Sequence, residues 1–282
     1  MPVIVTSDLK IHYRQGGQGK QPLVFVHGNY ASSRWWVPQL ERLPEGARGY
    51  ALDLRGVGGS RASPPRRELT IGDLASDLGQ FLDALRLNDP ILVGHSLGGV
   101  IVTEYALRRP NTTRGLVLVD TGPPNGLPLA ALAEPFALPF KLKSRALMQT
   151  ALRQAGAPHR GRLAKELVDD ALATDPDQYV AFSRAVADWN VEAQLPRLRV
   201  PSLLVWGKGD RLLPPRIGRR YLELLPQARL VTLPGAGHSP HVEQPDEFAA
   251  VLGDFLTRLT ARVERVPGKP RSLLERLLVG RR

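Results

Sequence analysis

The sequence predicts an α/β fold in which a mostly parallel, twisted sheet carries helices on both faces. Short and fully apolar runs, such as residues 23–26, are typical of strands that are covered on both sides. Segments with helical spacing of apolar residues alternate with these runs, and this alternation favours parallel strands joined by crossover helices. The alternation stops over residues 122–198, which keep a helical pattern and show no strand signal.

Each element is predicted from its local pattern. Apolar runs predict strands at residues 3–5, 9–13, 23–26, 50–54, 91–93, 116–120, 202–207 and 229–233. Helical spacing predicts helices at about residues 33–43, 71–85, 100–108, 217–225 and 246–259. Thr70 and Asp73 give the second of these helices an N-cap signal.

The interrupted alternation predicts an inserted helical unit. We expect an α/β core formed by residues 1–121 and 199–262, with a helical cap at 122–198 after the sixth strand. Residues 263–282 form a basic, amphipathic C-terminal extension in which leucines make an apolar stripe between arginines. Such a segment can touch an anionic membrane surface through residues 271–282, dock on a partner, or pack on its own domain.

Composition limits the class of protein. The chain has 282 residues, of which 43% are hydrophobic, enough for one large domain with a substantial core. It contains no cysteine, which excludes disulfide scaffolds and thiol catalysis. The net charge is +11, but the arginines are scattered and no basic run is interleaved with aromatic residues, so we expect no nucleic-acid partner. We find no signal peptide and no transmembrane segment, and we expect a cytoplasmic protein.

The most specific motif is a serine flanked by glycines between a predicted strand and a predicted helix. Residues 94–99 read Gly-His-Ser-Leu-Gly-Gly, which is the G-x-S-x-G pattern of a nucleophile elbow. The turn holds Ser96 in a strained conformation, and Gly94 and Gly98 are needed because the strand and the helix pass close together. Ser96 is therefore the candidate nucleophile.

A serine nucleophile needs a base, and the base needs an acid that orients it. His238 follows the last predicted strand, and Asp210 follows the strand before it. Both side chains are expected at the carboxyl edge of the sheet, which also carries Ser96. We therefore predict a catalytic triad of Ser96, Asp210 and His238.

Two backbone N–H groups are expected to form an oxyanion hole. One belongs to Leu97, directly after the nucleophile. The other belongs to the loop after residues 23–26, where Gly28 lets the backbone turn toward the site. Asn29 is the candidate for this second donor, and Tyr30 is the alternative.

These motifs make the chain resemble the α/β-hydrolase fold family, in its capped single-domain form, over roughly residues 3–262. The motifs are His-Gly-Asn at 27–29, Asp-Leu-Arg-Gly-Val-Gly-Gly-Ser at 53–60, the elbow at 94–99, the Gly-to-Asp turn at 207–210 and Gly-His at 237–238. The order Ser96, Asp210, His238 is also the order of the family's triads. The resemblance implies an esterase, lipase, lactonase, thioesterase, amidase, C–C hydrolase or perhydrolase, although some relatives are not enzymes.

Four other residues are weighed against these assignments. His241 is an alternative base, and Asp120, at the end of a predicted strand, is an alternative acid. His95 and His27 are expected to have structural roles, His95 because its side chain should point away from the nucleophile and His27 because it braces its loop.

The expected reaction is hydrolysis of a small-molecule carboxylic ester with a small to medium apolar acyl group. Ser96 suits attack on an acyl carbon, where an oxyanion develops, and this mechanism needs no metal and no organic cofactor. Acyl transfer, perhydrolysis, and lactone or C–C cleavage are alternative reactions of the same triad, and a slow-turnover ligand-binding or signalling protein is an alternative of another class. The residues predicted to line an apolar pocket are Tyr30, Trp35, Phe136, Phe140 and Trp189.

Overall fold

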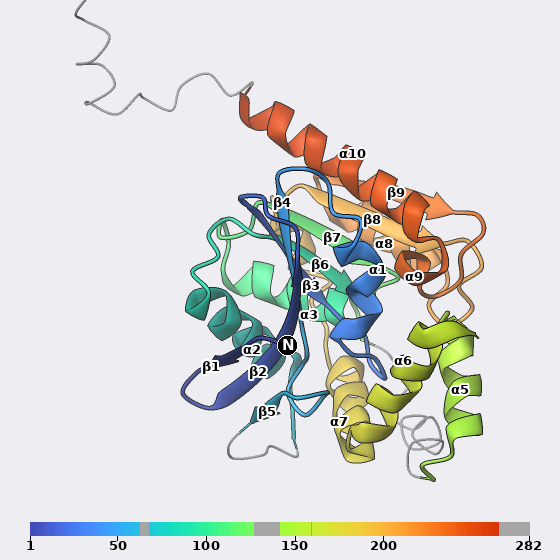
Figure 1. Ribbon diagram of the computed structural model, residues 1–282. Coiled ribbons are helices and arrows are strands. Elements are labelled where there is room, and N and C mark those ends of the chain that lie inside the picture. Colours follow the sequence, from blue (N-terminus) through green and yellow to red (C-terminus); the bar gives the residue numbers. More distant parts are fainter. Residues whose placement is uncertain (63–67, 127–141, 159, 265–282) are drawn as a thin grey trace, which may run out of the picture.

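The structure, a computed structural model, describes residues 1–62, 68–126, 142–158 and 160–264. Its centre is a nine-stranded sheet in the order β1-β2-β4-β3-β6-β7-β8-β9, with β5 paired to β2 (Figure 1). The strands are β1 Val3–Val5, β2 Leu9–Gly16, β3 Gln21–Val26, β4 Ala47–Leu52, β5 Arg61–Ala62, β6 Ile91–His95, β7 Gly115–Val119, β8 Ser202–Gly207 and β9 Ala228–Leu233.

The pairing confirms the predicted mostly parallel sheet. Strands β3, β4, β6, β7, β8 and β9 pair in parallel, whereas β1, β2 and β5 pair antiparallel to their neighbours. Parallel neighbours need long crossover connections, and the helices supply them. The helices are η1 Ser33–Trp36, α1 Val37–Leu40, α2 Ile71–Ala84, α3 Leu97–Arg108, α5 Arg145–Gln154, α6 Gly161–Ala173, α7 Pro176–Ala187, η2 Leu195–Arg197, α8 Arg216–Leu224, α9 Pro240–Glu243 and α10 Pro245–Glu264.

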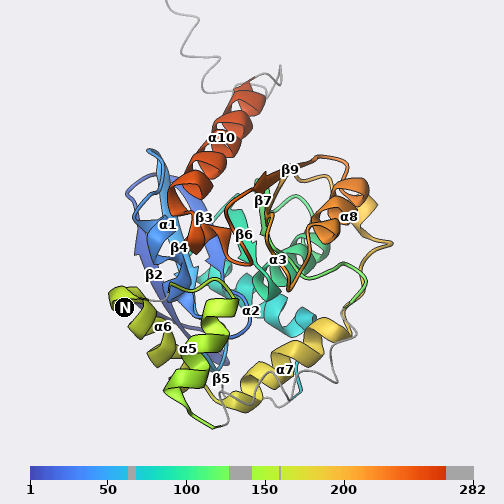
Figure 2. The same ribbon diagram turned by 90° about the vertical axis from the view of Figure 1, so that its right-hand side faces the viewer.

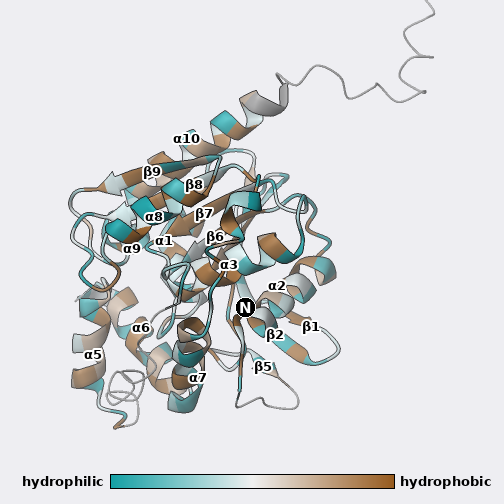
Figure 3. Cartoon of the chain, turned by 180° about the vertical axis from the view of Figure 1, so that it is seen from behind, coloured by the Kyte–Doolittle hydropathy of each residue, from teal (hydrophilic) through white to brown (hydrophobic). Residues whose placement is uncertain are grey.

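The helices form a layer on each face of the sheet. Figure 2 shows α1 and α10 on one face and α2, α3 and α8 on the other. Along β3, Val24 and Val26 join the apolar cluster of the second face, whereas Leu23 and Phe25 join the cluster that contains Trp36 of η1. Because both faces need apolar side chains, the central strands are almost uniformly hydrophobic, as the brown strands in Figure 3 show.

Local sequence signals explain where two helices begin and end. Thr70 caps α2 through the predicted capping box, in which its side chain accepts a hydrogen bond from the N–H of Asp73 and the Asp73 side chain accepts from the N–H of Thr70. The helix predicted at 33–43 is instead a 3₁₀ turn followed by the short α1, which ends at Leu40. Pro44 disfavours a helical backbone at Leu43, so no helix here can extend past that residue.

The chain leaves the sheet between β7 and β8 and forms α5, α6 and α7, with no strand in residues 120–126, 142–158 and 160–201. Figures 1 and 2 show these three helices grouped at one end of the sheet. The division into a core and a separate cap stays a prediction. Phe136, Phe140 and residues 265–282 lie outside the described residues. No helix in the described part of the chain combines the length and the apolarity needed to cross a membrane.

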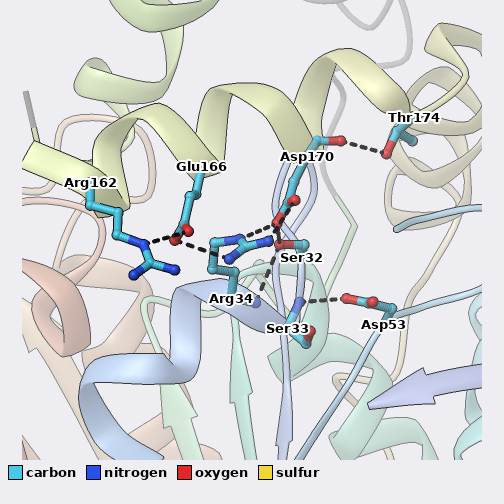
Figure 4. Close-up of polar contacts among 8 residues, drawn as sticks. All are labelled: Ser32, Ser33, Arg34, Asp53, Arg162, Glu166, Asp170 and Thr174. Carbon is cyan, nitrogen blue, oxygen red and sulfur yellow. Dashed lines mark hydrogen bonds and ion pairs between the residues drawn. The ribbon is translucent and has the colours of Figure 1, made fainter. Parts of the chain in front are cut away.

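An ionic cluster connects α6 to the loop after β3 (Figure 4). Arg34 donates to both carboxylate oxygens of Asp170, at 2.8 and 3.2 Å, and its Nη1 lies 3.0 Å from a Glu166 oxygen. The Ser32 hydroxyl donates to the same Asp170 carboxylate at 2.7 Å. The paired guanidinium and carboxylate are well matched in geometry, so the cluster fixes α6 over the loop that carries the predicted oxyanion donor.

Candidate active site

Ser96 stands in the strained turn that the elbow motif predicts. It follows β6 directly and precedes α3, with φ 52° and ψ −116°. A Cβ atom on Gly98 would lie 2.1 Å from the carbonyl oxygen of Val26, and one on Gly94 would lie 2.3 Å from that of Gly98. Only glycine fits these two positions, because backbone atoms leave no room for a side chain. A residue in such a conformation stores about 1–3 kcal/mol of strain, which the surrounding packing must offset.

The structure brings His238 and Asp210 together at the carboxyl ends of β9 and β8. The ring Nδ1–H of His238 donates to Oδ2 of Asp210 at 2.8 Å, and both side chains are buried. The other Asp210 oxygen accepts hydrogen bonds from the N–H groups of Leu212 and Leu213, at 2.8 and 2.9 Å. The carboxylate is thus fixed by its own loop, and it fixes the imidazole tautomer that leaves Nε2 free of its proton.

The loop around His238 is braced from two sides. His95 donates its Nε2–H to the carbonyl oxygen of His238 at 2.8 Å. Glu243 accepts from the N–H groups of Gly237 and Ser239, at 2.9 and 2.8 Å. Glu243 carries no motif in the sequence, and its one signal is an acidic residue at the end of the short helix after the histidine loop.

The two backbone N–H groups predicted to form the oxyanion hole belong to Leu97, directly after Ser96, and to Asn29, in the loop after β3. The N–H of Leu97 opens α3, where no intrahelical acceptor exists. Among the described residues, no acceptor engages it or the N–H of Asn29. The Asn29 side chain is tied to α7, because its amide donates to the Tyr179 carbonyl at 3.1 Å and to the Ser183 hydroxyl at 2.8 Å.

Tyr30 is a poorer oxyanion donor than Asn29. Its N–H already donates to Oδ1 of Asn29 at 3.0 Å, and its φ of 61° turns the backbone at this point. The Tyr30 ring packs at 4.9 Å from that of Tyr179 in α7. Its place between the core and α7 is compatible with the predicted pocket lining, which stays a prediction.

The two tryptophans predicted to line the pocket lie in packed surroundings. Trp35 is buried and stacks against His95, with ring centroids 6.4 Å apart. Trp189 is also buried, and its indole N–H donates to Glu104 of α3 at 2.9 Å. The Trp189 contact joins the segment after α7 to the core, whereas the Trp35 contact lies within the core. A role of either residue in substrate binding stays a prediction.

The alternative base and the structural histidines are all deeply buried. Neither ring nitrogen of His241 has a hydrogen-bond partner in the described part of the chain, and its ring stacks on Trp36 at 4.2 Å, so no carboxylate orients it. The His27 ring accepts from the N–H of Leu54 at 3.1 Å and donates to the Gly28 carbonyl at 2.8 Å, which braces its loop. Burial lowers the pKa of His27 and lowers that of His241 well below the ordinary value.

Asp120, the alternative acid, lies next to the acid that contacts the histidine. Asp120, Asp210 and His238 each present a polar atom within 4.8 Å of the others. Burial opposes ionisation of Asp210, but the hydrogen bond and the charge of His238 outweigh it and hold the pKa of Asp210 below its usual value. Asp210 is therefore the carboxylate that can balance a positive charge on His238.

Comparison with known proteins identifies the family. The sequence matches the family described as "Alpha/beta hydrolase family" over residues 23–251. A protein named "Putative carbamate hydrolase RutD" from Variovorax paradoxus is 32% identical over 272 residues, which cover 93% of this chain and 100% of that protein. A "Pimeloyl-(acyl-carrier protein) methyl ester esterase" from Shewanella woodyi is 30% identical and covers 88% of this chain and 98% of its own length.

Solved structures agree with this match. A hydrolase from Pseudomonas aeruginosa PA01 superimposes with a TM-score of 0.78 at 29% identity, over 90% of this chain and 97% of that one. An esterase from Exiguobacterium antarcticum shares the fold, with a TM-score of 0.79 at 23% identity, over 88% of this chain and 96% of that one. The protein therefore belongs to the alpha/beta hydrolase family, and it is a hydrolase.

Proposed function

We propose that the protein is a serine hydrolase that cleaves carboxylic esters with a small to medium apolar acyl group. The observation that carries this proposal is the buried 2.8 Å hydrogen bond from His238 to Asp210, on the same sheet edge as the strained Ser96. A serine alcohol is a weak nucleophile at neutral pH, and an imidazole oriented by a carboxylate is the group that activates it.

The proposed mechanism uses His238 to move protons and the other groups to attack the carbonyl or to stabilise charge. Nε2 of His238 takes the proton of the Ser96 hydroxyl while the serine oxygen attacks the acyl carbonyl. The N–H groups of Leu97 and Asn29 donate to the oxyanion that forms, and Asp210 balances the charge on the imidazolium. The same imidazolium gives its proton to the leaving alcohol. Water, deprotonated by His238, then releases the acid from the acyl-enzyme.

A second candidate reaction is hydrolysis of a carbamate. It is favoured by relatives at 29–32% identity that are named as carbamate hydrolases. The same serine, base and oxyanion donors can act on a carbamate carbonyl, so the site geometry is common to both reactions. Substrate preference therefore has to be measured.

The deciding experiment compares p-nitrophenyl esters from acetyl to dodecanoyl, with a p-nitrophenyl carbamate beside them. We expect Ser96→Ala to lose turnover by about a millionfold. Ser76→Ala is the matched control and should leave turnover unchanged. This serine is exposed on α2, and the one hydrogen bond that its hydroxyl makes to the described residues goes to the Gly72 carbonyl. Turnover that persists in Ser96→Ala would overturn the proposal. Turnover of the carbamate alone would replace the ester reaction by the second candidate.

A further inference from the structure

Asp120 is a fully buried carboxyl group for which the proposed mechanism has no use. It directly follows β7, and its backbone N–H donates to the carbonyl of Val205 at 3.0 Å, which places it across from the end of β8. Its Oδ1 accepts the N–H of Gly207 at 3.1 Å. Its Oδ2 receives no hydrogen bond from an N–H or O–H group within the described residues.

The group that faces Asp120 is the carboxyl of Asp210. The two side chains lie within hydrogen-bonding reach of each other, in the same cluster as the His238 ring. The Asp210 carboxyl already accepts two backbone N–H groups and the imidazole N–H. A carboxyl group that accepts three hydrogen bonds is best suited to carry the negative charge. Asp120 accepts fewer hydrogen bonds, so a second negative charge on Asp120 would be poorly stabilised.

Two adjacent buried carboxyl groups cannot both be ionised without a large electrostatic cost. Burial, then the charge of Asp210 and the hydrogen bond to it, raises the pKa of Asp120 well above its ordinary value. The other titratable groups that face this cluster are His238 after β9, Glu243 of α9 and His95 of β6. Glu243 acts in the same direction on Asp120, since a nearby negative charge disfavours a further one.

We propose that Asp120 is a positioning residue, which stays protonated at neutral pH and donates its carboxyl hydrogen bond to Asp210. Asp210 then keeps one orientation toward His238 during the proton transfers of the reaction, a role that rests on the proposed function. The three groups then hold two protons between them: Asp120 holds one, Asp210 holds none and His238 holds one at Nδ1. Asp120 thus belongs to the site as a neutral donor and not as a replacement acid.

The first test detects this proton directly and needs no substrate. A difference infrared spectrum at neutral pH, between the unmodified protein and Asp120→Asn, should contain the C=O stretch of one protonated carboxylic acid. Asp254→Asn is the matched control and should show carboxylate bands only, because hydrogen bonds from Arg258 and Arg229 lower the pKa of Asp254. Absence of the protonated band in the Asp120→Asn difference would overturn the proposal.

The second test uses the pH dependence of kcat/KM. Asparagine keeps both contacts, because its oxygen can accept from Gly207 and its amide can donate to Asp210. Asp120→Asn should therefore retain the rate and the midpoint of the acid limb. If Asp120 were ionised, removing its charge would make protonation of His238 less favourable and shift that midpoint down by roughly one pH unit, which would contradict the proposal.

Asp120→Ala tests whether the effect passes through Asp210. This variant loses the donor and should lower kcat by roughly tenfold to a hundredfold with little change in KM. In an Asp210→Ala background the same change should cause no further loss, whereas a full second loss would show an action independent of Asp210 and overturn the proposal. If neither the unmodified protein nor any variant hydrolyses an ester, the proposed function fails. A protonated carboxylic acid band would still support the proton on Asp120.

Discussion

The stability of this protein should fall on mild acidification, because histidines are buried in their neutral form beneath the site. Burial, with a smaller contribution from the neighbouring His238, lowers the pKa of His95 to about 3. His95 has no carboxylate partner, and its only described hydrogen bond is the one that Nε2–H donates to the His238 carbonyl. A proton on this ring would have to be accommodated in buried surroundings, next to the His238 ring.

Proton linkage determines the direction and the size of this change in the unfolding free energy. The unfolded chain binds a proton at an ordinary histidine near pH 6.5, whereas native His95 binds one only near pH 3. Its contribution is therefore fully present above about pH 6.5 and is lost as the pH falls through this window. The loss is about 1.4 kcal/mol per pH unit, or about 2 kcal/mol at pH 5. This is a sizeable share of the roughly 5–15 kcal/mol by which domains are stable.

The assay is urea unfolding between pH 7 and pH 5, for the unmodified protein and for His95→Gln. Glutamine can still donate to the His238 carbonyl and cannot titrate. The free energy of unfolding of the variant should therefore depend less steeply on pH, by about 1 kcal/mol per unit on average over this range. Comparing slopes removes any constant destabilisation by the substitution. His241→Gln, at another deeply buried histidine, should flatten the slope as well. Parallel slopes for His95→Gln and the unmodified protein would refute the reasoning.

The remaining predictions concern loops and glycines around the site. Arg34→Ala should cost about 1–2 kcal/mol of unfolding free energy, since it leaves the Asp170 carboxylate without its guanidinium partner. Arg162→Ala, whose side chain is 90% exposed and touches the same cluster, should change the unfolding free energy by less than about 0.5 kcal/mol. Gly98→Ala should lower the unfolding free energy by about 3 kcal/mol, because the added Cβ meets backbone atoms. Gly253→Ala in α10, where a Cβ meets nothing within 4 Å, should raise the unfolding free energy by about 0.5–1 kcal/mol. Glu243→Gln leaves one loop N–H without an acceptor and should lower both stability, by about 1 kcal/mol, and kcat on p-nitrophenyl acetate.

Sequence patterns predicted those parts of the structure that local physics decides. The elbow was predictable because Gly94 and Gly98 have no substitute where two backbones touch. The meeting of His238 with Asp210 was predictable because parallel strands end at one edge. In contrast, the packing of Asp120 against Asp210 depends on β7 being the neighbour of β8, and a single sequence does not state which strands are adjacent. The contacts of Trp189 depend equally on how the inserted helices lie on α3.

The inserted helices α5, α6 and α7 contact the loops on both sides of the proposed reaction centre. Arg34 and the Asn29 side chain tie the oxyanion loop to α6 and α7. On the other side, Ser239 directly follows the proposed base His238. Its hydroxyl donates to the carbonyl of Ala155, the C-cap residue of α5. The proposed base and the proposed oxyanion donor thus belong to loops that the same insertion supports. A shift of the helices α5, α6 and α7 would therefore also move the proposed catalytic groups.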